Sequence, residues 1–231
     1  YINDLNLLNF NENPMRIDAI NARVLNSAYN MTVSSSDGEL LFFSDGIRIF
    51  DQAAEQMPNG RITNSLFGFT SIQPALGFQH LDDPNQYYIF YVKNGPIRTN
   101  AGSIFLPYTE GELYYSMLDM SLNNGRGDIV AEENDILVQE GITGGMVALR
   151  GYCGAIWVLV HEYNTNRFLA FEVTGQGVAE PVISEVGAVI NYDSLQYGAG
   201  INGLYASPQH DKIVSYHQTT QSTQLFDFDR K

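Results

Sequence analysis

The sequence predicts an all-β protein: a β-propeller of WD40- or kelch-like blades, each an antiparallel four-stranded sheet. Three observations predict this fold. A turn signal followed by a short apolar run recurs along the chain, helical hydrophobic stripes are nearly absent, and the composition suits pleated strands. Aromatic residues make up 12% of the 231 residues, charged residues only 16%, and 21 glycines supply tight turns.

The first repeat unit begins near Met31 and contains the clearest turn signals. Asp37-Gly38 precedes an apolar run over residues 40–43, and Asp45-Gly46 precedes another over residues 47–50. An Asp-Gly pair between two apolar runs is the strongest short-range signal for a β-hairpin. The pattern therefore predicts a meander of short antiparallel strands.

Three more units repeat this order, with central apolar runs that begin near Tyr87, Ile156 and Ile213. Blades of this kind span about 40–50 residues, so the wider spacings require insertions. Glycine and proline place these insertions at residues 93–111 and 186–203. A β-sandwich would account for the strands, but not for the similar opening of each unit.

The expected organisation is an N-terminal entry segment over residues 1–30, followed by propeller blades over residues 31–231. About four units are visible, whereas propellers close with about 4–8 blades. The ring is therefore expected to be partial, or part of a larger ring that continues beyond the chain. The absence of Met at Tyr1, and an apolar run directly before the end at Lys231, are also expected of a processed or partial chain.

The net charge of −14 and the isoelectric point near 4.4 exclude nucleic acid as an expected partner, because phosphate binding needs clustered Lys and Arg. Membrane insertion is not expected, since no segment approaches the roughly 20 apolar residues that span a bilayer. The lone cysteine, Cys153, cannot form an internal disulfide. Its aromatic neighbours Tyr152 and Trp157 predict that it is a small buried apolar residue.

Three segments carry a resemblance to a known family. The first extends from Asp37-Gly38 through Asp51 to Met57-Pro58-Asn59-Gly60. The second consists of Tyr87-Tyr88-Ile89-Phe90 and of the stretch from Leu113-Tyr114-Tyr115-Ser116 to Gly127-Asp128. The third extends from Cys153-Gly154 to Phe168. In order and spacing they are similar to the N-terminal β-propeller-like region of gliding-motility-associated, type IX secretion system secreted bacterial surface proteins.

The resemblance covers residues 31–231 and implies an extracellular location at the bacterial cell surface. It also implies a multi-domain protein with a separate C-terminal sorting domain, and a role in adhesion or gliding. The family has no agreed catalytic residues that could be transferred to this sequence.

No motif in the sequence predicts catalysis or a bound cofactor. Residues 198–203 match the dinucleotide-binding motif G-x-G-x-x-G in sequence, but the residues that follow predict a strand instead of the helix that such a site requires. We therefore expect an inter-blade loop at residues 198–203. His161-Glu162 lacks the second histidine of a zinc helix, and turn or surface positions are expected for His80, His161, His210 and His217.

Asp37 and Asp45 are expected to be turn residues that accept hydrogen bonds from nearby backbone N–H groups. Calcium would suit loops with carboxylate and carbonyl ligands. No segment matches a defined calcium loop, so no metal or cofactor is predicted.

The sequence thus favours a non-catalytic extracellular binding or scaffold module, whose partner is a protein or a glycan at the cell surface. The ligand contacts are predicted at five aromatic residues: Phe67, Phe69, Tyr108, Tyr192 and Tyr197. Asp193-Ser194-Leu195 matches the acceptor pattern for O-glycosylation at Ser194 in this bacterial group.

Two alternatives remain open. One is a carbohydrate-active hydrolase-type propeller, which would need a convergent Asp/Glu/Tyr cluster with perturbed pKa values. The other is a purely structural component of a surface or secretion assembly, in which a partner or further blades would close the ring.

Overall fold

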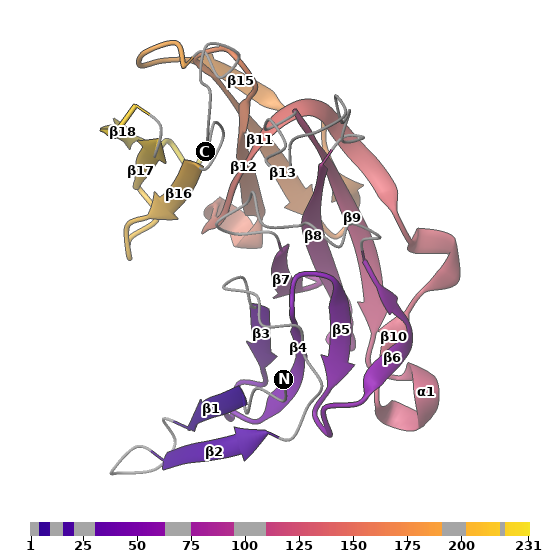
Figure 1. The fold of residues 1–231 in the computed structure, drawn as a ribbon. Coiled ribbons are helices and arrows are strands. Elements are labelled where there is room, and N and C mark those ends of the chain that lie inside the picture. The colour runs from indigo at the N-terminus through magenta and orange to yellow at the C-terminus, as the bar shows by residue number, and fades with distance from the viewer. Residues whose placement is uncertain are drawn as a thin grey trace, which may run out of the picture.

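The computed structural model describes residues 5–9, 16–20, 31–62, 75–94, 110–190, 202–217 and 220–231. These residues form antiparallel sheets with very little helix (Figure 1), so the prediction of an all-β protein is confirmed. Within this described part of the chain, the strands close neither a barrel nor a ring. Most of both predicted insertions, and the five predicted aromatic contacts, lie outside the described residues.

The N-terminal part of the fold consists of two separate sheets. A hairpin of β1 (Leu5–Asn9) and β2 (Arg16–Ile20) forms the first. The second sheet, called here the first meander, pairs each strand with the next in the chain: β3 (Met31–Ser34), β4 (Leu40–Ser44), β5 (Arg48–Asp51) and β6 (Gln56–Arg61).

A nine-stranded sheet forms the middle of the molecule, because the long strand β11 belongs to two meanders. The first half of β11 pairs with β9 and its second half pairs with β12, with a register shift between Ile142 and Met146. The strands of this sheet are β7 (Ala75–Gln79), β8 (Gln86–Asn94), β9 (Gly111–Asp119), β10 (Asp128–Ile129), β11 (Ile136–Arg150), β12 (Ile156–Glu162), β13 (Arg167–Thr174), β14 (Gly177–Val178) and β15 (Val182–Glu185).

We call β7, β8, β9 and the first half of β11 the second meander. The second half of β11, with β12, β13 and β15, is the third meander. The fourth meander is a three-stranded sheet of β16 (Asn202–Ala206), β17 (Lys212–His217) and β18 (Ser222–Asp227). The apolar runs predicted near Leu40, Tyr87, Ile156 and Ile213 each form the second strand of one meander.

The turns of the first meander follow the predicted chemistry. The Asp45 carboxylate Oδ1 accepts hydrogen bonds from the backbone N–H groups of Ile47 and Arg48, at 3.0 and 2.7 Å. Gly38 and Gly46 both have a φ of +83°, which a residue with a side chain rarely adopts. The predicted role of Asp45 as a turn acceptor is therefore confirmed, and Gly38 and Gly46 supply the positive φ of the two turns.

Alternate residues along β8 belong to two different hydrophobic clusters. Tyr87, Ile89 and Tyr91 pack in a cluster with the first meander, whereas Tyr88, Phe90 and Val92 pack in a cluster with the third. Since successive side chains of a strand point to opposite faces, both faces of the second meander are buried.

The third meander is buried on both faces in the same way. From β12, Val158 and Val160 join the cluster shared with the second meander, while Trp157 and Leu159 join a third cluster shared with the fourth meander. The four meanders thus pack face to face in chain order, with one hydrophobic layer between each neighbouring pair.

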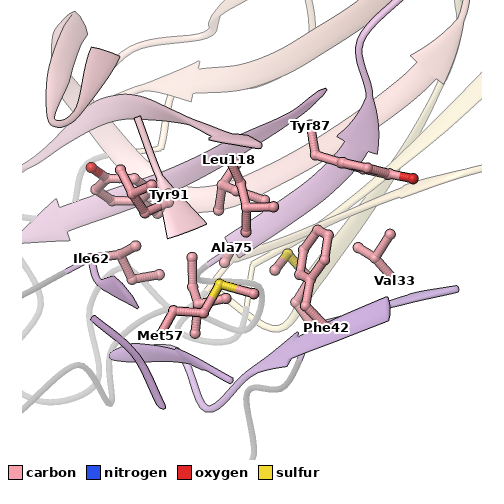
Figure 2. Packing of buried hydrophobic residues seen from close by; sticks show 12 residues of the cluster. Val33, Phe42, Met57, Ile62, Ala75, Tyr87, Tyr91 and Leu118 are labelled. Atoms are coloured by element: carbon pink, nitrogen blue, oxygen red, sulfur yellow. The ribbon is translucent and has the colours of Figure 1, made fainter. Parts of the chain in front are cut away.

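Figure 2 shows the layer between the first and second meanders, where Phe42 and Met57 lie opposite residues that include Tyr87 and Leu118. The rings of Phe42 and Tyr87 meet edge to face, with 5.3 Å between their centroids. Because Gly77 of β7 has no side chain, β3 can pack closely against it. A Cβ atom at Gly77 would lie only 2.8 Å from Met31 Sδ and 2.9 Å from Val33 Cγ2.

Hydrogen bonds and ion pairs connect the first and second meanders near their outer strands. The backbone N–H and the side-chain amide of Asn59 both donate to the Asp128 carboxylate, each at 2.9 Å. Arg126 forms ion pairs with Asp51 and Glu55, each at 2.6 Å. The segments that carry the family resemblance thus contact each other across the fold.

Cys153 is exposed, so the prediction that it is buried is wrong. It lies in the turn between β11 and β12 and has a φ of +54°. Across this turn the Gly151 N–H donates a hydrogen bond to the Ala155 carbonyl oxygen at 2.8 Å. The turn lies outside the hydrophobic layers, and the chain returns to the core at Ala155 and Trp157, which are both buried.

The close packing of β3 on β7 is testable at Gly77. Gly77→Ala should lower the free energy of unfolding by about 1–3 kcal/mol, because the added methyl group overlaps Val33. Urea unfolding, followed by the fluorescence of the single tryptophan, measures this change. In a Val33→Ala background the cost should shrink, and an equal cost in both backgrounds would contradict the close contact.

The lock between the outer strands is testable at Asn59. Asn59→Ala should lower the free energy of unfolding by about 1–3 kcal/mol, because one oxygen of the buried Asp128 carboxylate loses its donor. The exchanged pair Asn59→Asp with Asp128→Asn restores one donor and one acceptor. It should therefore recover part of the loss, and a double variant no better than Asn59→Asp alone would exclude a direct pairing.

Candidate functional site

A cleft with a volume of about 570 Å³ lies where β3 ends beside β7 and β8. We call it the β3–β8 cleft. Its walls come from the first two meanders and the turns that follow β3 and β7. The residues that line it are Thr32, Val33, Ser34, Ser35, Ser36, Leu41, Gly77, Phe78, Gln79, Pro84, Asn85, Tyr87 and Met120.

Side-chain hydrogen bonds fix the two turns that form the rim of the cleft. In the β3–β4 turn, Ser35 Oγ accepts the backbone N–H of Glu39 at 3.2 Å. In the β7–β8 turn, His80 Nδ1 accepts the backbone N–H groups of Asp82 and Asp83, both at 3.2 Å. His80 is therefore a turn residue, as predicted, and it shapes the rim.

The described lining of the β3–β8 cleft is polar and uncharged. Hydroxyl groups from the β3–β4 turn and amides from Gln79 and Asn85 lie beside Tyr87. The Phe78 ring lies on the other face of β7, where it stacks on Phe90 with 5.7 Å between the ring centroids. None of the described residues that line it is Asp, Glu, Lys, Arg or His. This contrasts with a chain whose net charge is −14.

Tyr87 is the single lining residue with a perturbed pKa. Burial raises the pKa of its hydroxyl above the ordinary 10.0, and a hydrogen bond with Gln79 lowers it in part. The side chain is 6% exposed, and its hydroxyl points out of the hydrophobic cluster in Figure 2. The hydroxyl therefore stays protonated near neutral pH, so it can donate or accept a hydrogen bond but cannot serve as a base.

A second cleft of about 510 Å³ lies beside β10 and contains the carboxylates Asp119, Asp128 and Glu132. Burial raises the pKa of Asp119, but hydrogen bonds from Ser121 and Gln86 outweigh burial and leave the pKa below its usual value. Asp128 accepts the two bonds from Asn59 and the backbone N–H of Ile129. Both carboxylates thus hold local structure.

The structure brings His161 and His217 together between the third and fourth meanders. Each is 1% exposed, and their ring centroids lie 5.6 Å apart. The predicted turn or surface position is therefore wrong for both. Both histidines occupy inward-facing positions of strands. His161 belongs to β12, which is buried on both faces, and His217 lies on the buried face of β17 together with Ile213 and Ser215.

A hydrogen-bond partner is seen for His217 but not for Nδ1 of His161 in the described residues. Ser215 Oγ lies 2.9 Å from His217 Nε2. His161 Nδ1 is buried and has no hydrogen-bond partner in the structure described here. Burial lowers the pKa of His161 to about 3, with a further contribution from His217, and burial also lowers the pKa of His217. Both rings are therefore neutral at pH 7.

His210 lies in the turn between β16 and β17, as predicted, where its Nδ1 accepts the backbone N–H of Arg150 at 3.3 Å. In the described ranges, no group of three or more His, Cys, Asp or Glu residues could hold a metal ion. Ser194 and most of the glycine motif lie outside those ranges, and Gly203 belongs to the strand β16 that follows it.

No protein-family model matches the chain, and no curated protein matches it. Among the described residues, no helix is long and apolar enough to cross a membrane. The resemblance to gliding-associated surface proteins therefore stays a prediction from the sequence.

The buried histidine pair predicts a specific acid sensitivity. The folded-state pKa of His161 is depressed from 6.5 to about 3, so between these pH values the unfolded chain binds a proton that the folded chain does not. The stability contribution of the neutral ring is therefore complete above pH 6.5 and is lost as the pH falls toward 3. Each pKa unit corresponds to about 1.4 kcal/mol. The free energy of unfolding should fall across this window, and His161→Phe should make its decline with pH less steep.

Urea unfolding at a series of pH values between 7 and 4 measures this slope. The control is Gln176→Ala, because Gln176 is an exposed residue without a titratable side chain and should leave the slope as it is in the parent. A parent and a His161→Phe variant with the same pH slope would show that His161 does not titrate in this way.

Proposed function

We propose that this chain is a non-catalytic binding or scaffold module with β-propeller architecture, and that it binds its ligand in the β3–β8 cleft. The proposal places it outside a bacterial cell or at the cell surface, in adhesion or gliding. Its partner there is a glycan or a protein.

The order of the strands supports the propeller architecture. The first strands of successive meanders lie near one another: β3 beside β7, β7 beside β11, and β11 beside β16. Each meander then extends outward through antiparallel pairing of consecutive strands. Meanders of three or four strands that pack face to face, with their first strands around one axis, resemble the blades of a WD40- or kelch-like propeller. In this interpretation the chain supplies four blades of a partial or larger ring.

The uncharged lining of the β3–β8 cleft is the observation that carries the binding function. General acid–base catalysis needs a titratable group near the reacting atoms, and metal catalysis needs ligands. The described lining contains no Asp, Glu, Cys or His, and its titratable group, the Tyr87 hydroxyl, stays protonated near neutral pH. It offers hydroxyls and amides that can exchange hydrogen bonds with a ligand. Such a lining suits an uncharged, hydroxyl-rich ligand, so a neutral glycan fits better than a charged one.

The hydrolase alternative requires two carboxylates about 5–10 Å apart around a substrate. In the acidic cleft beside β10, Asp119 and Asp128 are instead occupied by bonds that hold Ser121 and Asn59. This arrangement favours binding over hydrolysis.

A glycan array of neutral and charged oligosaccharides tests the proposal, with affinities of positive glycans then measured by calorimetry. Thr32→Val and Asn85→Ala should each weaken binding about 3–10-fold, because each removes one hydrogen-bonding group from the cleft. Gln176→Ala is the control, since Gln176 is an exposed amide in the β13–β14 turn outside the cleft. Neutral glycans that bind all three variants equally would contradict the site, and cleavage of a bound glycan would support the hydrolase.

A further inference from the structure

We propose that the outer edge of β18 binds an extended peptide strand from another polypeptide. The peptide has apolar residues at alternate positions and Lys or Arg between them. This site is separate from the β3–β8 cleft and does not depend on a ligand there. Strand addition at a sheet edge is a known mode of peptide recognition, with backbone hydrogen bonds for affinity and side-chain pockets for specificity.

The fourth meander has one strand fewer than its neighbours. The first meander has four paired strands, and in the third meander the outer side of β13 pairs with β14 and β15. In the described chain, β18 pairs with β17 alone. It lies on the side of the fourth meander away from β11 in Figure 1. The outer edge of β18 therefore offers backbone N–H and C=O groups to a further strand.

An apolar cavity of about 60 Å³ opens between the third and fourth meanders beside this edge. Phe168 and Ala170 line it from β13, Phe226 and Phe228 from β18 and the residues that follow, and Val186 from the end of β15. Its volume is about twice the 30 Å³ that a water molecule occupies in the liquid, enough for the branched end of a small aliphatic side chain.

Exposed apolar side chains concentrate around the same cavity. Val182 is 56% exposed, and Val186, which lines the cavity, is 41% exposed. Val182 pairs with Ala170 across β13 and β15, so both side chains lie on the face that carries the cavity. Apolar residues of an added strand on the Phe226 side would cover these groups, which are otherwise in water.

The opposite face of β18 explains the basic residues of the proposed peptide. Leu225 is 65% exposed and lies on the same face as Asp227, two residues further along the strand. The Asp227 side chain is 89% exposed although it pairs with Lys212. Lys or Arg residues on this face can lay their aliphatic stems over Leu225 and extend their charged ends to Asp227. The net charge of −14 attracts such a peptide at longer range.

Binding of a fluorescein-labelled heptapeptide of alternating Lys and Val tests the proposal, by fluorescence polarisation and hydrogen–deuterium exchange. The peptide should bind and slow amide exchange over residues 222–227. A version N-methylated at alternate backbone nitrogens cannot complete the strand pairing, and a version with Glu in place of Lys meets like charge. Both control peptides should bind at least tenfold more weakly.

Val186→Arg and Leu225→Lys should each weaken binding of the Lys-Val peptide at least tenfold, through loss of cavity space and like-charge repulsion. Leu137→Lys is the matched control, because Leu137 is also an apolar strand residue, 46% exposed, but belongs to β11. It should bind as the parent does. Thermal unfolding shows whether each variant folds.

Absence of binding at about 1 mM peptide overturns the proposal, as does binding without protection of residues 222–227. Protection, in the free chain, of those amides of residues 222–227 that point away from β17 would also overturn it. If that protection rises with protein concentration, a second copy of the chain occupies the edge. If it is independent of concentration, a segment of the same chain does.

Discussion

The packing of this protein depends on strands whose two faces are both buried. In an ordinary two-layer β protein, one face of each sheet meets water, and its sequence alternates between apolar and polar residues. Here β8 places Tyr87, Ile89 and Tyr91 in one hydrophobic layer and Tyr88, Phe90 and Val92 in the next. A substitution on either face therefore affects a core, and the meanders must stack in chain order.

Close stacking also requires particular small and polar residues. Gly77 lets β3 approach β7, and the Asn59–Asp128 and Arg126–Asp51 contacts fix the outer strands of the same two meanders. Asp51, Asn59 and Asp128 belong to the motifs on which the family resemblance depends. Their contacts give those motifs a structural role, because they hold neighbouring sheets together rather than presenting groups to a ligand.

The same arrangement separates charge from the candidate binding surfaces. Asp119 and Asp128 beside β10 are engaged in a turn and in a contact between meanders, whereas the described lining of the β3–β8 cleft consists of hydroxyls, amides and apolar side chains. At the other end of the stack, the fourth meander has a buried face around Ile213 and an outer face that exposes Tyr205 and Leu225. The two surfaces thus differ in chemistry: the cleft suits an uncharged polar ligand, and the edge of β18 suits a basic strand.

The sequence by itself determined the all-β class, the second strand of each meander and the Asp-Gly turns, because these depend on neighbours only a few residues away. It also determined that His80 and His210 lie in turns. It did not predict that Cys153 is exposed or that His161 and His217 meet, since a turn outside the core and a contact between separate sheets are set by packing. The β3–β8 cleft and the β18 edge were likewise decided by tertiary structure. Each depends on how strands that are far apart in the sequence pack together, and the local residue pattern does not specify that packing.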